Sequence, residues 1–348
     1  MRKESLPVVT LLSTIVLLSC SPAPMVSVRI QKPAQMYLPD VKTIAIADFQ
    51  GSNGSGSQIA TLTQSMLMAA QYYDIMERDK LRLVLEEQNL GLSGIVDQAT
   101  AVEVGKLLGV DALIFGEVAT YKVEPDERGV EKVERKVGTG KYEVVEKKNI
   151  FTGKKYKAKE EIMKTVLVDQ HYRIRRGTVA INFRAVGVET GQLLAAHSDS
   201  KSYNSGKVVE GSWETLKPEG QILSDLSRDI CQRFVQLIAP YYWTEKRIIE
   251  PGKGSINVGA KYAQSGLWPE ALESWKRAVV EMPKESAGFY NLGLAYEVQG
   301  DYDEAEQKYQ SALGLKQKKL YMEALARVRK LKTEQKALEE QLRDREEE

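Results

Sequence analysis

The chain of 348 residues has only two cysteines and two histidines. Cys20 belongs to a processing signal described below, so Cys231 is left without a partner and a disulfide framework within one mature chain is excluded. Zinc sites usually need several Cys or His ligands, and His171, His197 and Cys231 do not have the spacing of such ligands. We therefore expect no metal and no other cofactor.

The sequence also lacks an excess of charge of either sign, with 49 Lys and Arg against 48 Asp and Glu. This balance gives no reason to expect nucleic acid as a partner. The two histidines stand in strand-like segments without a nucleophile motif, so no Ser/His/Asp or Cys/His set is indicated. The sequence predicts a protein that is not an enzyme and has no small-molecule substrate.

No apolar run is long enough for a transmembrane helix, which needs roughly 20 residues. Leu6–Leu18 is a shorter run that follows the basic residues Arg2 and Lys3, as in a secretory signal peptide. The run ends in Leu-Leu-Ser before Cys20, which resembles the lipobox of bacterial lipoproteins. The resemblance implies cleavage after residue 19 and acylation (palmitate among the acyl chains) of Cys20, with Ser21 directing the protein to the outer membrane. We expect a lipid-anchored protein that faces the periplasm.

Residues 20–40 contain four prolines, a density that favours an extended tether. The next segment, 41–248, alternates short strands with amphipathic helices in its first half. Strands are predicted at 41–49, 73–77 and 111–123, with three helices between them. Strand signals follow at 178–188 and 193–203, and 166–175 is expected to pair with them. A closing helix from about Gln221 places Cys231 beside its apolar face, as a buried inert thiol. The predicted fold class is α/β, a mixed sheet covered by helices.

Several motifs in this segment resemble the curli assembly and transport lipoprotein family, the CsgG family. They are IAIADF, a Gly-rich turn, MERDKLRLVLEEQNLGLSGIVD, KLLGVDALIFGEV and FRAVGVETGQLL, in the family's order and spacing. The resemblance implies an α/β periplasmic domain and, in the best-known members, a ring-shaped pore that exports amyloid subunits.

Residues 122–164 are a poor match to the long membrane hairpins of such pores, because Lys, Arg and Glu dominate them. Lys or Arg on a lipid-facing strand costs about 2–4 kcal/mol near the bilayer centre. We expect a solvated, charged β-hairpin. The Gly-rich turn at 51–56 lacks the Lys of a P-loop, so it is interpreted as a tight connection between strand and helix.

Residues 252–321 repeat with a period of 34, which relates Gly259 to Gly293 and Trp275 to Tyr309. This period and this pattern resemble two tetratricopeptide (TPR) repeats, an all-α helical-repeat domain. Residues 322–348 are expected to form a capping helix and then a charged, solvated helical tail. The resemblance places a groove for partner proteins on Lys253, Ile256, Ala260, Gln264, Tyr290, Leu294, Glu297 and Val298; packing of Ile256, Leu294 and Val298 against the preceding domain is the alternative.

The sequence thus predicts an outer-membrane lipoprotein that acts as a scaffold or assembly factor by binding other envelope proteins, with homo-oligomers possible. Two alternatives stay open: a subunit of an oligomeric outer-membrane secretion channel for curli-like subunits, and an activator of a peptidoglycan synthase.

Overall fold

The computed structural model describes residues 24–87 and 98–346. The described chain divides into two units. The α/β unit contains residues 33–241 and the chain from Glu340 onward, and the helical unit contains the chain as far as Lys32 together with Tyr242–Glu339. Among the described residues, no helix combines the length and the apolar character needed to cross a membrane.

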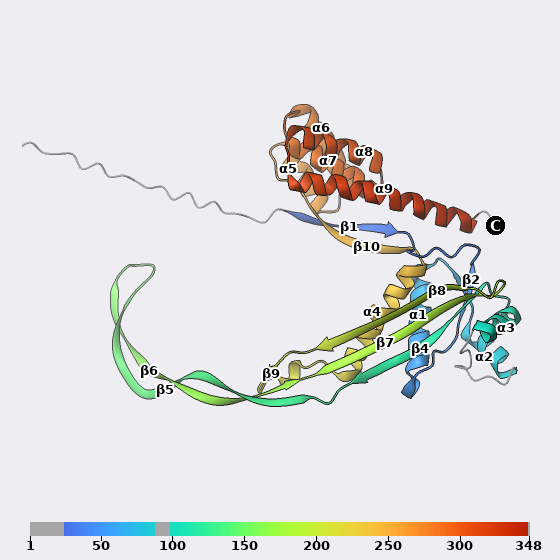
Figure 1. Ribbon diagram of the computed structural model, residues 1–348. Helices are drawn as coiled ribbons and strands as arrows, with labels where there is room; N and C mark the ends of the chain where they lie inside the picture. The colour runs from blue at the N-terminus through green and yellow to red at the C-terminus, as the bar shows by residue number, and fades with distance from the viewer. Residues whose placement is uncertain (1–23, 88–97, 347–348) are drawn as a thin grey trace, which may run out of the picture. The chain divides into compact units, whose positions relative to one another are not determined.

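A five-stranded mixed sheet forms the centre of the α/β unit (Figure 1). Its strand order is β3-β2-β4-β7-β8, in which β2 is parallel to β3 and β4, while β7 is antiparallel to β4 and β8. The strands are β2 (Thr43–Ile46), β3 (Asp74–Ile75), β4 (Ala112–Val123), β7 (Arg176–Gly187) and β8 (Leu193–Asn204). The mixed sheet predicted from the alternating pattern is confirmed.

Helices cover both faces of this sheet because alternate strand residues are apolar on both sides. On β2, Ile44 and Ile46 pack with α1 (Ser55–Ala70) and α4 (Glu219–Ile238). Ala45 on β2 and Ala47 just after it pack with α2 (Arg78–Glu87) and α3 (Gln98–Leu108). The central strands are therefore buried on both faces.

The Gly-rich turn is a tight connection from β2 to α1, as predicted. A short 3-10 helix, η1 (Ser52–Gly54), leads into α1. A Cβ on Gly56 would overlap the carbonyl oxygen of Phe49, so only glycine allows this close approach.

Cys231 is buried on the core face of α4, as predicted. The hydroxyl of Thr63 on α1 donates a hydrogen bond of 3.5 Å to its sulfur. Burial raises the pKa of the thiol to about 11, so the thiol stays protonated near neutral pH.

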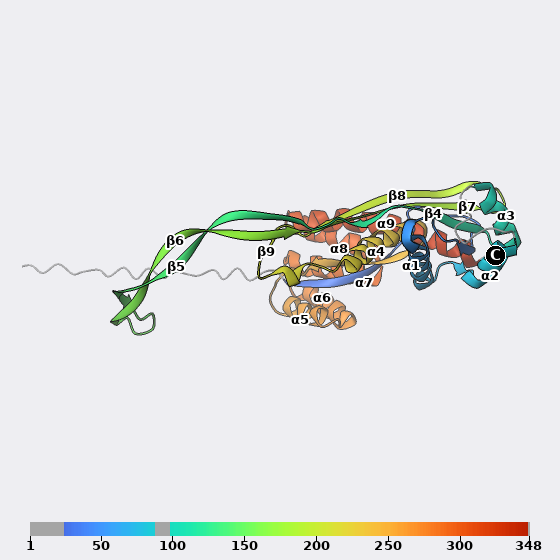
Figure 2. The ribbon, with the colours of Figure 1, turned by 90° about the horizontal axis from the view of Figure 1, so that it is seen from below.

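A long hairpin, which we call the arm, extends from the sheet where β4 ends and β7 begins (Figures 1 and 2). It consists of β5 (Glu127–Lys148) and β6 (Lys155–Ile174), and the short β9 (Val208–Val209) pairs with the base of β6. The predicted pairing of 166–175 with the sheet is wrong, because β6 pairs with β5 along its length. Alternation identifies a strand without identifying its neighbour, and the turn after β5 brings β6 back beside it.

The helical unit contains two helix pairs, most of a long final helix and a two-stranded sheet of β1 and β10. The helices are α5 (Ser255–Gln264), α6 (Trp268–Glu281), α7 (Ser286–Gln299), α8 (Tyr302–Leu315) and α9 (Lys319–Glu346). Each pair is held close by the same contact. A Cβ on Gly259 would overlap the indole of Trp275, and a Cβ on Gly293 would lie 2.8 Å from the ring of Tyr309.

The strands β1 (Met25–Lys32) and β10 (Tyr241–Ile248) were not predicted. Part of the expected tether at 20–40 is therefore a strand. Its alternate residues Val26, Val28 and Ile30 are buried in the core of the helical unit, and this apolar alternation outweighs the proline content on either side.

Candidate interaction surfaces

The two faces of the arm differ in character, because residues opposite each other in an antiparallel pair lie on the same face. One face, here the apolar face, is rich in aliphatic and aromatic side chains. Its apolar members are Val133, Val137 and Val145 on β5 and Tyr156, Ala158, Ile162, Val166, Val168, Tyr172 and Ile174 on β6. All of them are at least partly exposed to solvent. An isolated two-stranded hairpin is marginally stable in water, so this face is a candidate surface for contact with another molecule.

The other face of the arm is mostly charged. Its charged members are Arg128, Lys132, Glu134, Lys136, Glu146, Lys148, Lys155, Lys157, Lys159, Glu161, Asp169 and Arg173. A smaller set of apolar residues lies among them: Val130, Tyr142, Val144, Met163 and Leu167. The hairpin of β5 and β6 overlaps the charged hairpin predicted at 122–164, but it begins at Glu127 and extends to Ile174. The sequence did not reveal the apolar face, because its residues separate onto one side only when the strand register is known.

An ion pair closes the base of the arm. Arg175, between β6 and β7, donates two parallel hydrogen bonds to the carboxylate of Asp126, with N···O distances of 2.7 and 2.9 Å. It also donates to the carbonyl oxygen of Lys217 at 2.9 Å. The hydrogen bond from Arg175 lowers the pKa of Asp126, more than burial raises it. The junction between arm and sheet is therefore fixed by charge-assisted hydrogen bonds.

The C-terminal residues of α9 lie on the α/β unit and are not a solvated tail, which corrects the prediction for the end of 322–348. The side chain of Gln341 is buried and exchanges two hydrogen bonds with the backbone of Ala34, at 2.9 and 3.1 Å. The hydroxyl of Tyr72 donates to the carbonyl oxygen of Gln341 at 3.0 Å. Tyr37 donates to Asp344 at 2.8 Å.

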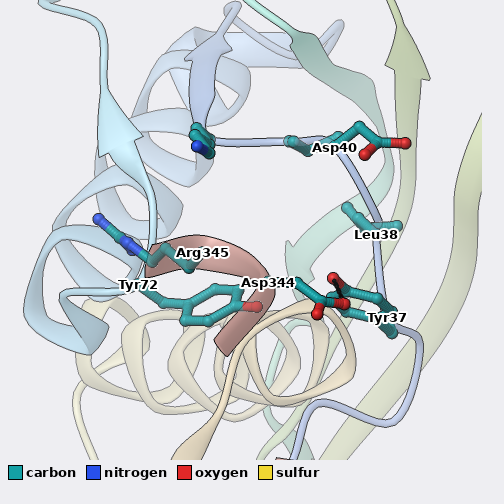
Figure 3. Close-up of a pocket in the computed structure, with 8 residues that line it drawn as sticks. Tyr37, Leu38, Asp40, Tyr72, Asp344 and Arg345 are labelled. Atoms are coloured by element: carbon teal, nitrogen blue, oxygen red, sulfur yellow. Dashed lines mark hydrogen bonds between the residues drawn. The ribbon is translucent and has the colours of Figure 1, made fainter. Parts of the chain in front are cut away.

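A small cavity lies beside these contacts, between Tyr37, Asp40, Tyr72 and the end of α9 (Figure 3). The guanidinium of Arg345 lies over the ring of Tyr72, 5.5 Å from its centroid. The cavity volume is about 20 Å³, which holds about one water molecule. The cavity is too small for an organic substrate.

The eight residues expected to form a partner groove fall into two groups. Ile256, Ala260, Tyr290, Leu294 and Glu297 are buried in the helical unit. Lys253 and Gln264 are exposed and Val298 is partly exposed. In this conformation only the second group offers surface to a partner. The buried Ile256 and Leu294 and the half-buried Val298 pack within the helical unit, so the binding role of the groove stays a prediction.

Glu297 is the centre of a buried charge cluster in the helical unit. Its carboxylate accepts hydrogen bonds from Arg247 at 2.7 Å, from Arg327 at 2.9 and 2.8 Å, and from Tyr309 at 2.7 Å. Burial alone would raise the pKa of Glu297, but these donors and the positive charges outweigh burial and lower it. The cluster joins β10, α7, α8 and α9, which is a structural role that the sequence pattern did not reveal.

The predicted lipid-attachment residue, Cys20, lies outside the described residues. Within those residues, no group of three His, Cys, Asp or Glu side chains is placed to hold a metal ion.

Comparison with known protein families assigns most of the α/β unit to one family. The family model described as "Curli production assembly/transport component CsgG" matches residues 41–214, half of the chain. The protein belongs to the CsgG family. A second family model, a domain of unknown function (DUF6340), matches residues 257–340. This match leaves the TPR interpretation a prediction, while the CsgG-like α/β fold followed by a helical region is established.

Solved structures similar to this CsgG-family chain are distant. The PelC dodecamer from Paraburkholderia phytofirmans is 10% identical, with a TM-score of 0.29, over 62% of this chain and 98% of that one. The LpoB C-terminal domain from Escherichia coli is 8% identical, with a TM-score of 0.27, over 48% and 86%. Lipoprotein GNA1162 from Neisseria meningitidis is 12% identical, with a TM-score of 0.31, over 56% and 98%. No curated protein matches the chain.

Proposed function

We propose that this CsgG-family chain is an outer-membrane lipoprotein, anchored through Cys20 and facing the periplasm. It assembles envelope proteins, and it associates with further copies of itself through the arm. The apolar face of the arm is the observation that carries the proposed self-association. Its helical unit is proposed to consist of TPR repeats, because Gly259 with Trp275 and Gly293 with Tyr309 make the same close contact one period apart.

A second copy of the chain is the partner that best fits the arm. The strand order β5-β6-β9 leaves β5 at an edge, with unpaired backbone groups on its outer side. Such an edge readily pairs with a strand of another chain. Beyond its short pairing with β9 at Tyr172 and Arg173, β6 presents a second edge. If β5 of one copy pairs with β6 of the next, the apolar faces form one continuous surface, and the head-to-tail contact generates a ring when its rotation closes.

Two neighbouring residues of β6 test this proposal, because they lie on opposite faces of the arm. Val168 is opposite Val133 on the apolar face, while Leu167 is on the charged face and 66% exposed. Sedimentation of the detergent-extracted full chain should show an oligomer. Val168→Glu should shift it to the monomer, and the control Leu167→Glu should leave it unchanged.

Both variants should unfold at the same denaturant concentration in the α/β unit, which separates loss of association from loss of folding. A wild-type chain that sediments as a monomer, or two variants that behave alike, would contradict self-association through this face.

The membrane anchor is tested separately. Cells fed labelled palmitate should incorporate label into the wild-type chain and not into the Cys20→Ser variant. Label in neither chain would remove the lipoprotein part of the proposal and leave the arm experiment unaffected.

The secretion-channel alternative makes a different prediction. A channel subunit would give stable ion conductance in planar bilayers, abolished by deletion of residues 122–164, whereas a scaffold would form oligomers without conductance.

A further inference from the structure

The end of the arm is a closed, hydrogen-bonded turn between β5 and β6. The side-chain oxygen of Asn149 accepts hydrogen bonds from the backbone N–H groups of Phe151 and Thr152, both at 2.9 Å. The backbone of Asn149 also pairs with Lys154 and Gly153, each at 2.9 Å. The side chain and the backbone of Asn149 therefore hold the turn closed.

Ile150 and Phe151 are 94% and 97% exposed, the highest values among the large apolar residues that the structure describes. Two adjacent apolar side chains at the apex of a convex turn have no wall beside them that could bury them within the chain. Exposure of this kind marks a contact site for an apolar environment.

Lysines surround this apex. Residues 147–159 contain six lysines and no Asp or Glu. The lysines are Lys147, Lys148, Lys154, Lys155, Lys157 and Lys159. Within the described structure only two of them form ion pairs, Lys147 with Glu160 and Lys155 with Glu146. The tip therefore carries a concentrated positive charge, although the whole chain is nearly neutral.

The strand register places two of these lysines directly against each other. Lys148 is the cross-strand partner of Lys155, in the last pair before the turn. Like charges directly opposite each other destabilise an antiparallel pair. A negatively charged surface at the tip would offset the repulsion between these two lysines.

We propose that the tip of the arm binds the surface of a phospholipid bilayer that bears anionic headgroups. Ile150 and Phe151 enter the boundary between headgroups and acyl chains, about 5–10 Å deep as amphipathic segments do. The surrounding lysines contact the headgroup phosphates. This contact is independent of Cys20 and of the self-association proposed above, because a single copy carries the whole tip.

Charge and shape together favour a bilayer over a protein partner. A protein groove that accepted the apex would need to bury the flanking lysines against matching acids. A bilayer accepts the two apolar side chains while the long lysine side chains remain in the headgroup layer. The attraction should weaken as salt screens the charges, because the Debye length falls from about 10 Å at 0.1 M to about 3 Å at 1 M.

A fluorescent label at the tip tests the proposal in the full chain. Thr152→Cys, next to the apolar pair, is labelled with a polarity-sensitive nitrobenzoxadiazole group in a Cys20→Ser background, where the remaining Cys231 is buried. With vesicles of phosphatidylcholine mixed with phosphatidylglycerol, the emission should rise and shift to shorter wavelengths. With phosphatidylcholine alone it should stay near its value in buffer. The same label at Val280→Cys on α6, a residue that is also exposed, should not respond to either vesicle.

Substitutions separate the two contributions. Ile150→Ser with Phe151→Ser should abolish the shift at position 152. Lys148→Gln, Lys154→Gln and Lys159→Gln together should weaken vesicle binding at least about tenfold. The matched control removes the same charge from exposed lysines of the helical unit, Lys246, Lys261 and Lys284, and should have no effect.

Three results would overturn the proposal. The first is no response at position 152 with phosphatidylglycerol, and the second is an equal response with neutral vesicles. The third is a response that grows with protein concentration in the absence of vesicles, because this would show that another copy of the chain covers the tip.

Discussion

Arg175 and Asp126 form a bidentate ion pair at the junction between the five-stranded sheet and the arm. Their side chains are 18% and 12% exposed, so water competes only partly for the pair. Asp126 leads into β5 and Arg175 follows β6, and the pair therefore fixes the spacing of both strands of the arm at its base.

Replacing Asp126 with Asn should loosen this base. Loss of the charge-assisted hydrogen bonds should lower the unfolding free energy by about 1–2 kcal/mol, and amide exchange should become faster around Arg175. Denaturant unfolding and hydrogen exchange measure the two effects. Asp225→Asn, which removes an exposed partner of Lys217, is the control and should change the unfolding free energy little.

The same pair predicts a pH dependence. The pKa of Asp126 is lower in the folded chain than the value of about 3.9 for an unperturbed Asp. The stabilisation is therefore complete above about pH 3.9 and is lost as the pH falls through the lowered pKa. Between neutral and acidic pH, the difference in stability between wild type and Asp126→Asn should shrink. A difference that stays constant to pH 2 would contradict this.

Glu297 should be intolerant of substitution. Glu297→Ala leaves Arg247 and Arg327 without their shared carboxylate in the interior, at a cost of about 3–5 kcal/mol. Glu273→Ala is the control, because Glu273 pairs with Lys276 at the surface and should contribute less than about 1 kcal/mol. Urea unfolding of the helical unit measures both. Equal losses of unfolding free energy in the two variants would show that the buried cluster stabilises the helical unit no more than a surface ion pair does.

Two glycines of neighbouring helices should respond to alanine with opposite sign. At Gly293 the new methyl group would lie 2.8 Å from the ring of Tyr309, so crowding should destabilise the chain by about 1–3 kcal/mol. At Gly314 on α8 a Cβ would meet no atom within 4 Å, so the better helix propensity of alanine should stabilise by about 0.5–1 kcal/mol. Thermal unfolding of the two variants is the test, and stabilisation by Gly293→Ala would contradict the close helix contact.

Gln341→Ala should destabilise the α/β unit, although position 341 is far from the sheet in sequence. The change leaves the N–H and C=O groups of Ala34 without partners in a buried position, which costs about 1–3 kcal/mol. Glu340→Ala, at the exposed neighbouring residue, is the control. The unfolding free energy of the α/β unit is the measurement, and equal values for the two variants would exclude a supporting role for Gln341.

The elements that could be predicted from sequence are those with local apolar periodicity. Along α4, Ile222, Leu226, Ile230 and Phe234 recur at helical spacing, and all four are buried in one core. In β7, alternate residues from Val179 to Ala185 are likewise buried. In both elements the apolar periodicity can be recognised from residues that are close together in sequence.

The relationships that could not be predicted depend on residues that are distant in sequence. β1 pairs with β10 more than two hundred positions later, and nothing near Val28 indicates that partner. The 34-residue period identified positions that are equivalent in the two repeats, such as Ile256 and Tyr290. It did not show which of these side chains are buried. Tyr290 is buried because Tyr321 stacks on its ring, Tyr309 packs against it at a tilt, and its hydroxyl donates to the carbonyl oxygen of Ile248 on β10.

The position of β1 limits the distance between the helical unit and its proposed anchor at Cys20. A tether over the whole of 20–40 would let the folded part range widely. β1 begins at Met25, only five residues after Cys20, and an extended chain covers about 3.5 Å per residue. Once Cys20 is acylated, the start of β1 can move no more than about 17 Å from the acylated cysteine. With the proposed anchor in place, any protein bound by the helical unit would therefore lie close to the membrane surface.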